Sequence, residues 1–354
     1  MDEIRTSGAR ALALPRPAFA IARPRLRRAA LVTGALGAVT AALFLATLSV
    51  GSAYIPLPDV LRSLSGVGSN PGLDFLVLDL QLPVALSAVL AGGAFGLAGA
   101  IFQRLLQNPL AAPDLIGISY GASAAAVFAI LILNLTGLAI SGAALIGALA
   151  GAGLIYALAW RGGISGYRLI LIGIGVSQFL LGVVLYLTAR AELHDAREAM
   201  HWLVGSAGRA DWTEMYVLAG GLCLLVPVAW ALMRSLRALE LGDDAARALG
   251  ARVETVRLGL IAVGVTLVAL ATAVAGPLSF VGLVAWPVAR RLLGSGEGGV
   301  LAVSFVGAII VLTADLISQQ LLPVALPTGV VTGAVGAPYL LWLLATMNRG
   351  GIRG

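Results

Sequence analysis

Apolar stretches of about 20 residues recur along the whole chain of 354 residues. We count ten of them, at residues 29–50, 82–106, 115–134, 138–160, 166–189, 213–233, 256–275, 277–293, 300–321 and 327–346. A stretch of this length spans the hydrocarbon core of a bilayer, and in lipid its backbone polar groups must be bonded within a helix. Charged residues make up only 11% of the chain, which is too little to cover a water-facing surface. We therefore expect an all-α integral membrane protein with ten transmembrane helices in one bundle.

The distribution of basic residues predicts the orientation of these helices. The 23 basic residues are all arginines. With ten spans and an inner N-terminus, only four arginines fall on the outer side, namely Arg62, Arg190, Arg197 and Arg209. Because short basic loops stay in the cytoplasm, both termini are expected there. The net charge of +6 is then a topology signal, and the chain offers no basic folded face for a nucleic acid.

One transmembrane domain, residues 29–346, is expected between two cytoplasmic tails. The arginine- and proline-rich residues 1–28 lack a cleavage site and precede a full-length span, so they indicate a retained tail. Residues 347–354 form the second tail. The span at 277–293 is short and contains Pro287, a break that lipid tolerates only where neighbouring helices or water satisfy the freed backbone groups.

The sequence offers no candidate for catalysis, cofactor binding or metal binding. Cys223 is the only cysteine, which excludes an intrachain disulfide and a thiolate metal site. His194 and His201 lie in the outer loop 190–212 without a third ligand pattern, and an amphipathic loop helix is favoured there. No phosphate-binding loop occurs, so this chain is not expected to hydrolyse ATP.

Four sequence blocks carry a family resemblance. Residues 99–121 read as a polar hinge with Asn108, Pro109 and Pro113 between two apolar runs. Three further blocks follow in order, at 241–250 (LGDDAARALG), 276–291 (GPLSFVGLVAWPVARR) and 326–338 (LPTGVVTGAVGAP). Together they closely resemble the FecCD-type permeases, the membrane subunits of bacterial ABC importers for ferric siderophores, haem and cobalamin.

This resemblance implies a fold, a location and a set of partners. The fold would be a type II importer permease in the bacterial inner membrane, with an inverted repeat of five plus five helices. The implied partners are a second homologous permease, two ABC subunits that use ATP and Mg, and a substrate-binding protein. The implied cargo is a ferric siderophore, with haem or cobalamin as the alternative.

The inner loop 234–257 is the candidate coupling segment. Asp243 and Asp244 stand where carboxylates would cap the N-terminus of a short helix, and Gly250 suits the position just past its end. The resemblance identifies this helix as the element that seats on the ATP-binding subunit. The candidate coupling residues are Leu241, Gly242, Asp243, Asp244, Ala245, Arg247, Leu249 and Gly250.

The fifth span is the candidate for the transport pathway. A glutamine inside a span usually faces protein or water, and Gln178 stands there beside Ser177. Small residues can also serve close helix packing alone. The resemblance places this helix beside the pathway, and the candidate residues are Ser165, Gly166, Gly173, Gly175, Ser177 and Gln178.

Asp315 leaves two interpretations open. An acid inside a span is a functional candidate by default, and a proton relay would make this protein a secondary transporter. The resemblance implies instead a structural acid near the outer end of its helix. A membrane scaffold without transport is the third class considered.

The chain departs from the family at the expected docking positions for the binding protein. Gln81 and Val84 stand where the family usually has arginines, and Gln319 replaces a further one. The histidine that usually follows the proline of the eighth span is also missing at Trp286-Pro287. Three explanations are open: a second permease supplies the charges, Arg62 and the other outer arginines substitute, or the binding protein differs.

Overall fold

The computed structural model describes residues 18–51, 54–67, 70–113, 117–161, 166–250, 252–294, 299–320 and 326–350. All regular structure in these ranges is helical. The elements in chain order are α1 (Ala18–Ser49), α2 (Leu57–Ser65), α3 (Pro71–Asp74), the π-helical η1 (Phe75–Gln81), α4 (Leu82–Leu105), α5 (Ile118–Leu131), α6 (Leu138–Ala159), α7 (Gly166–Arg190), α8 (Leu193–Val204), the 3₁₀ turn η2 (Ala207–Arg209), α9 (Trp212–Leu239), α10 (Asp243–Ala248), α11 (Val253–Ala275), α12 (Val281–Leu293), α13 (Val300–Gln320) and α14 (Thr328–Gly350).

Each of the ten expected spans corresponds to a helix, which confirms the predicted fold class. Within the described residues, seven helices are long and apolar enough to cross a membrane, and α5 and Thr328–Leu343 are shorter apolar helices. The tenth is α12, which begins only at Val281. The loop helix favoured for residues 190–212 is α8, which buries Ala199 and Trp202 and leaves both histidines exposed.

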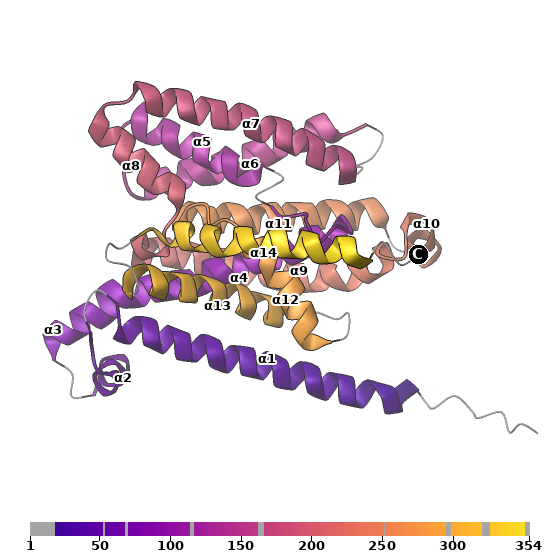
Figure 1. Ribbon diagram of the computed structural model, residues 1–354, viewed down its shortest axis with the longest axis horizontal. Coiled ribbons are helices and arrows are strands. Elements are labelled where there is room, and N and C mark those ends of the chain that lie inside the picture. Colours follow the sequence, from indigo (N-terminus) through magenta and orange to yellow (C-terminus); the bar gives the residue numbers. More distant parts are fainter. Residues whose placement is uncertain are drawn as a thin grey trace, which may run out of the picture.

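The helices run roughly along one axis, with α4 and α11 in the middle of the bundle (Figure 1). α13, α11, α12 and α9 surround α4, while α5 to α8 form a group along one side. α1 lies along the opposite edge and packs mainly on α13. The N-terminal end of α1, α10 and the C-terminal end of α14 share one end of the bundle, here called the inner end, and α2 and α3 lie at the other, the outer end.

The two halves of the chain pack in a matching way. In the first half α5 contacts α6 and α7, and α6 contacts α7. In the second half α12 contacts α13 and α14, and α13 contacts α14. Across the halves, α4 packs on α12 as α11 packs on α5. These corresponding neighbours support the expected inverted repeat, in which α4 and α11 are equivalent central helices.

Glycines let the central helices approach until their backbones touch. A Cβ added at Gly99 would lie 1.9 Å from the carbonyl oxygen of Gly282 in α12, and one at Gly92 would lie 2.6 Å from that of Gly307 in α13. Such approach is how helices pack when lipid removes the hydrophobic drive. In contrast, Gly142 and Gly153 of α6 have open space around that position, so they have no packing role of this kind.

Several helix ends differ from the expected boundaries. The second span is continuous from Pro71 to Leu105, because the π-turn of η1 accommodates Pro83, which has no N–H to donate. The sixth span continues past residue 233 to Leu239, with Arg234 stacked 5.0 Å over Trp230. Arginines of this kind extend a span because their stems stay in apolar surroundings while their charged ends reach water. α1 begins at Ala18, inside the expected tail, and residues 1–17 and 351–354 lie outside the described residues.

Gln103 of α4 compensates for the proline inside α12. Because Pro287 has no N–H, the carbonyl of Leu283, four residues earlier, loses its usual helical donor. The side-chain amide of Gln103 donates to this carbonyl at 3.0 Å and to the carbonyl of Gly282 at 3.1 Å. A neighbouring helix thus supplies the hydrogen-bond donor that the proline lacks, because a free carbonyl in the bilayer core has no water to bond.

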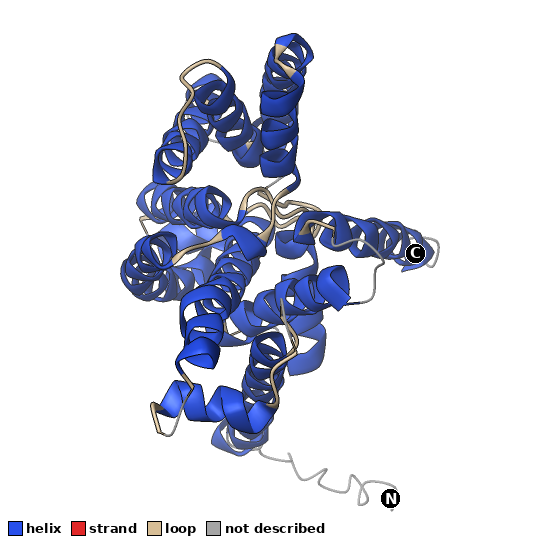
Figure 2. Cartoon of the chain, turned by 90° about the vertical axis from the view of Figure 1, so that its left-hand side faces the viewer, coloured by secondary structure: helices blue, strands red, loops and turns tan. Residues whose placement is uncertain are grey.

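Backbone hydrogen bonds join the end of α8, the end of α11 and the start of α14. The N–H of Ser206 donates to the carbonyl of Ala275 at 2.8 Å, and the N–H of Gly329 donates to that of Gly205 at 3.0 Å. Added Cβ atoms at Gly205, Gly276 or Gly329 would meet backbone at 2.7 Å or less. Figure 2, viewed along the bundle from the outer end, shows loops gathered between the helices.

Candidate functional site

The inner end presents α10 as a separate short helix beyond α9 (Figure 1). Gly242 is its N-cap residue, and no side chain accepts a hydrogen bond there, so the capping expected from Asp243 and Asp244 is wrong. Both aspartates lie inside the first turn, where their charge still opposes the helix dipole. Gly250 follows the helix with φ 81°, as expected of a C-terminal glycine.

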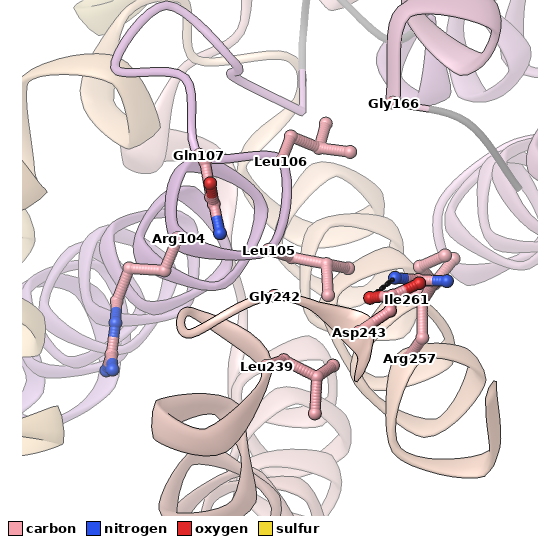
Figure 3. A pocket seen from close by; sticks show the side chains of 10 residues that line it. All are labelled: Arg104, Leu105, Leu106, Gln107, Gly166, Leu239, Gly242, Asp243, Arg257 and Ile261. Carbon is pink, nitrogen blue, oxygen red and sulfur yellow. Dashed lines mark hydrogen bonds and ion pairs between the residues drawn. The ribbon is translucent and has the colours of Figure 1, made fainter. Parts of the chain in front are cut away.

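An ion pair joins α10 to the central helix α11. A carboxylate oxygen of Asp243 lies 2.8 Å from a guanidinium nitrogen of Arg257, whose other nitrogen lies 3.0 Å from Glu254. Figure 3 shows Asp243 and Arg257 pointing toward each other at the edge of a pocket of about 200 Å³. The pocket also contacts Gly166, at the start of α7. The side chain of Arg257 is only 16% exposed, so this pair is less screened than a surface one.

A second ion pair joins the end of α9 to the central helix α4. The Nε of Arg104 lies 2.8 Å from a carboxylate oxygen of Glu240, and the amide of Gln107 donates to the Glu240 carbonyl at 3.3 Å. The Arg104 guanidinium also stacks 5.4 Å over the ring of Trp286 in α12. The two pairs therefore connect the segment on either side of Gly242 to both central helices.

The outward side of this segment carries exposed apolar residues. Leu241 is 66% exposed and Leu249 is 68% exposed, whereas Ala246 is fully buried against the bundle. The side chain of Asp244 is fully exposed, and its ion pair among the described residues is with Arg247, at 3.2 Å. The eight candidate coupling residues thus lie together, with two leucines directed away from the bundle. Their role in coupling stays a prediction.

The candidate pathway residues divide between a cavity and the helix packing. A cavity of about 740 Å³ lies between α5, α7, α8, α12 and α14, and Ser177 and Gln178 line it. Ser177 also donates to the carbonyl of Gly173 at 2.6 Å. Gly175 faces open space, and Ser165 lies outside the described residues.

Polar residues of α5 that the sequence did not single out complete this cavity. Ser119, Tyr120 and Ser123 line it together with Gln178, and the described lining residues include no charged side chain. The hinge contributes Ala112 at one end. In the hinge itself, Asn108 accepts a hydrogen bond from the N–H of Leu110 at 2.9 Å, and Pro113 packs against Gly282. The sequence could have indicated the α5 residues, because they recur on one helical face.

At the outer end, three of the four candidate docking residues come together. Gln81, Val84 and Gln319 line one pocket of about 480 Å³, here called the outer pocket, together with Asp315. Arg62 lies elsewhere, on α2, where it pairs with Asp59 at 2.9 Å. Gln81 is only 6% exposed, so it does not project from the surface as a docking side chain would.

Asp315 lies about one and a half turns from the C-terminal end of α13. Its carboxylate accepts hydrogen bonds from Gln319 at 2.7 Å and from Thr328, the first residue of α14, at 3.0 Å. These bonds hold α13 to the start of α14. The geometry favours the structural interpretation over a proton relay, because both carboxylate oxygens accept hydrogen bonds that fix the end of α13 and the start of α14.

Comparison with known proteins gives a consistent result. A model of the FecCD transport family matches residues 39–346. The ferric enterobactin transport system permease protein FepG of Escherichia coli (strain K12) is 40% identical over 305 residues, covering 85% of this chain and 92% of that protein. The achromobactin transport system permease protein CbrC of Dickeya dadantii (strain 3937) is 40% identical over 308 residues, covering 86% and 88%.

A solved structure supports the fold independently. An inward-facing metal-chelate type ABC transporter superposes with a TM-score of 0.80 at 22% identity, covering 89% of this chain and 99% of that chain. At this identity the likeness concerns the fold alone. It agrees with the ten-helix arrangement described above.

Proposed function

The chain belongs to the FecCD transport family, a family of ABC importer permeases in the inner membrane, and we propose that it moves a ferric siderophore across that membrane by alternating access. The observation that carries this proposal is the construction of the inner end. A short helix flanked by two exposed leucines is joined by ion pairs, on either side of Gly242, to the two most buried spans. A partner that moves this helix would move the centre of the bundle.

In the proposal, the energy for transport comes from two ATP-binding subunits that dock at the inner end. ATP and Mg would be used by those subunits, and this chain binds no cofactor in the proposal. Leu241 and Leu249 would enter an apolar groove on the partner, since exposed apolar residues of this kind mark interaction sites. The N-terminal end of α1 and the C-terminal end of α14 lie at this end, so the proposal places both tails in the cytoplasm, in agreement with the arginine distribution.

The proposed cargo follows from the relatives and from the cavity. The relatives named above transport ferric enterobactin and achromobactin. The cavity beside α7 is lined by hydroxyl, amide and apolar groups, which suits passage of a bulky polar chelate without tight binding. Haem or cobalamin remains the alternative cargo within the same family.

ATP-driven import predicts uptake that does not depend on the proton gradient. In vesicles that hold the whole transporter and a fixed internal ATP concentration, an uncoupler that collapses the gradient should leave ferric-siderophore uptake within about twofold of the untreated rate. Removing ATP while the gradient is kept should abolish uptake. The opposite pattern would identify a secondary transporter and would refute the proposal.

We further propose that the transporter contains a second, distinct permease. A homodimer would place two copies of Gln81, Val84 and Gln319 at the outer end, with no arginine at these positions on either side. Affinity purification of a tagged copy from cells that express the whole operon should recover a second homologous permease in equal amount. A transport-competent complex with two copies of this chain and no other permease would contradict this prediction.

A further inference from the structure

The outer pocket combines two polar groups whose bonding is incomplete. It lies between the C-terminal end of α1, the end of η1 and the end of α13. Its other walls are Leu326 and Pro327 before α14, His201 of α8, and Ser206 and Gly208 at η2. These elements meet at the outer end, opposite α10 (Figure 1). The groups that matter are the side-chain amide of Gln81 and the carboxylate of Asp315.

Gln81 provides the first group. Its side chain is 94% buried, because only 6% is exposed, and neither its nitrogen nor its oxygen has a hydrogen-bond partner among the described residues. It packs so closely on Gly51 that a Cβ there would lie 2.7 Å from the amide nitrogen. Buried amides nearly always have partners in native proteins. This amide therefore has a donor and an acceptor free for a molecule that enters the pocket.

Asp315 provides the second group. Its side chain is 2% exposed, and its only hydrogen bonds within the described residues come from the neutral groups of Gln319 and Thr328. None of the ion pairs among the described residues includes it. A buried carboxylate is normally balanced by a cation, because leaving its charge uncompensated is costly.

The walls of the pocket are held in place by bonds between helices. The amide of Gln320 donates to the carbonyls of Val50 and Gly51, the latter at 3.2 Å, which joins α13 to the end of α1. Thr328 joins α14 to Asp315. An occupant would therefore contact a preformed site shared by several helices.

We propose that the outer pocket binds a guanidinium group, the side chain of an arginine presented by a protein that docks on the outer end. A planar guanidinium can donate two parallel hydrogen bonds to a carboxylate and has further donors for the oxygen of Gln81. The volume of about 480 Å³ admits such a group. That the arginine arrives on a docked protein rests on the proposed function. In this contact the permease supplies the negative charge and its partner supplies the positive charge.

The test measures binding of small probes to the purified transporter in nanodiscs by saturation-transfer NMR. Arginine methyl ester should bind in the millimolar range. Citrulline methyl ester, its neutral counterpart of nearly the same shape, should bind at least tenfold more weakly. Equal binding of the two esters would overturn the proposal, and so would displacement of the arginine ester by equimolar sodium or potassium chloride.

Two variants and one control locate the site. Asp315→Asn should weaken the arginine ester at least tenfold. Gln319→Arg places an internal guanidinium four residues along the helix from Asp315, so it should abolish probe binding and raise the melting temperature. Val67→Arg adds the same charge at the outer end, just after α2, where the side chain is 70% exposed and does not line the pocket, and it should bind the probe as the unmodified chain does. Unchanged binding in Gln319→Arg would exclude the outer pocket as the site, even if Asp315→Asn failed to fold.

The two proposals can fail separately. Probe binding requires neither ATP nor cargo, so it tests the pocket without testing transport. Uptake that depends on the proton gradient would refute the importer and leave a positive binding result unaffected. Absent probe binding with normal ATP-driven uptake would refute only the pocket assignment.

Discussion

Gly99→Ala is expected to destabilise the bundle by about 3 kcal/mol, at the upper end of the usual cost of overpacking. The added methyl group would lie 1.9 Å from the carbonyl oxygen and 2.5 Å from the carbonyl carbon of Gly282. These atoms are backbone, so they cannot rotate away, and α4 and α12 must separate. Separation would also lengthen the hydrogen bonds from Gln103 that satisfy α12. The measurement is reversible unfolding of the purified chain in mixed micelles.

Gly153→Ala is the matched control for this change. It makes the same substitution within α6, where nothing lies within 4 Å of the added atom. Alanine is preferred over glycine inside a helix by roughly 1 kcal/mol, so the control should be as stable as the unmodified chain or slightly more so. Equal stabilities of the two variants would show that α4 and α12 do not touch at Gly99.

Asp243→Arg is expected to lower ATP-driven uptake at least tenfold, while membrane insertion is unchanged. The substitution places a second cation beside Arg257, where the ion pair now measures 2.8 Å. Repulsion would then replace the attraction that holds α10 to α11. Detachment of α10 should also make the chain more sensitive to chymotrypsin at Leu241 and Leu249, both already exposed. Uptake of ferric siderophore and the rate of proteolysis are the two measurements.

Asp244→Arg makes the same charge change one residue further along. The Asp244 side chain is fully exposed and, within the described ranges, pairs with Arg247 of its own helix, so the contact between α10 and α11 should survive. Proteolysis should therefore remain as slow as in the unmodified chain. Any loss of uptake would then come from weaker docking of the ATP-binding subunit on α10. If Asp243→Arg also retained normal proteolysis and uptake, the pair with Arg257 would have no part in coupling.

The number of spans and the position of α10 follow from local features of the sequence. Ten apolar stretches require ten helices, because backbone groups in lipid have no other partners. The position of α10 is equally local, since two aspartates and a following glycine in a polar loop mark where a short helix begins and ends. The loop helix α8 is likewise predictable, because its apolar residues recur at helical spacing among polar ones.

The contacts that give these elements a function were decided only by the tertiary structure. Glu240 lies 136 positions from Arg104, and Gln103 lies 180 positions from the carbonyl of Leu283. The sequence shows that these groups exist but not which ones face each other. Which groups face each other depends on how each helix is rotated about its axis and how far it is shifted along it. Backbone contacts between distant glycines set both. For the same reason Gln81, predicted on an exposed docking surface, is buried against Gly51 and beside Asp315, where the bundle forms a pocket.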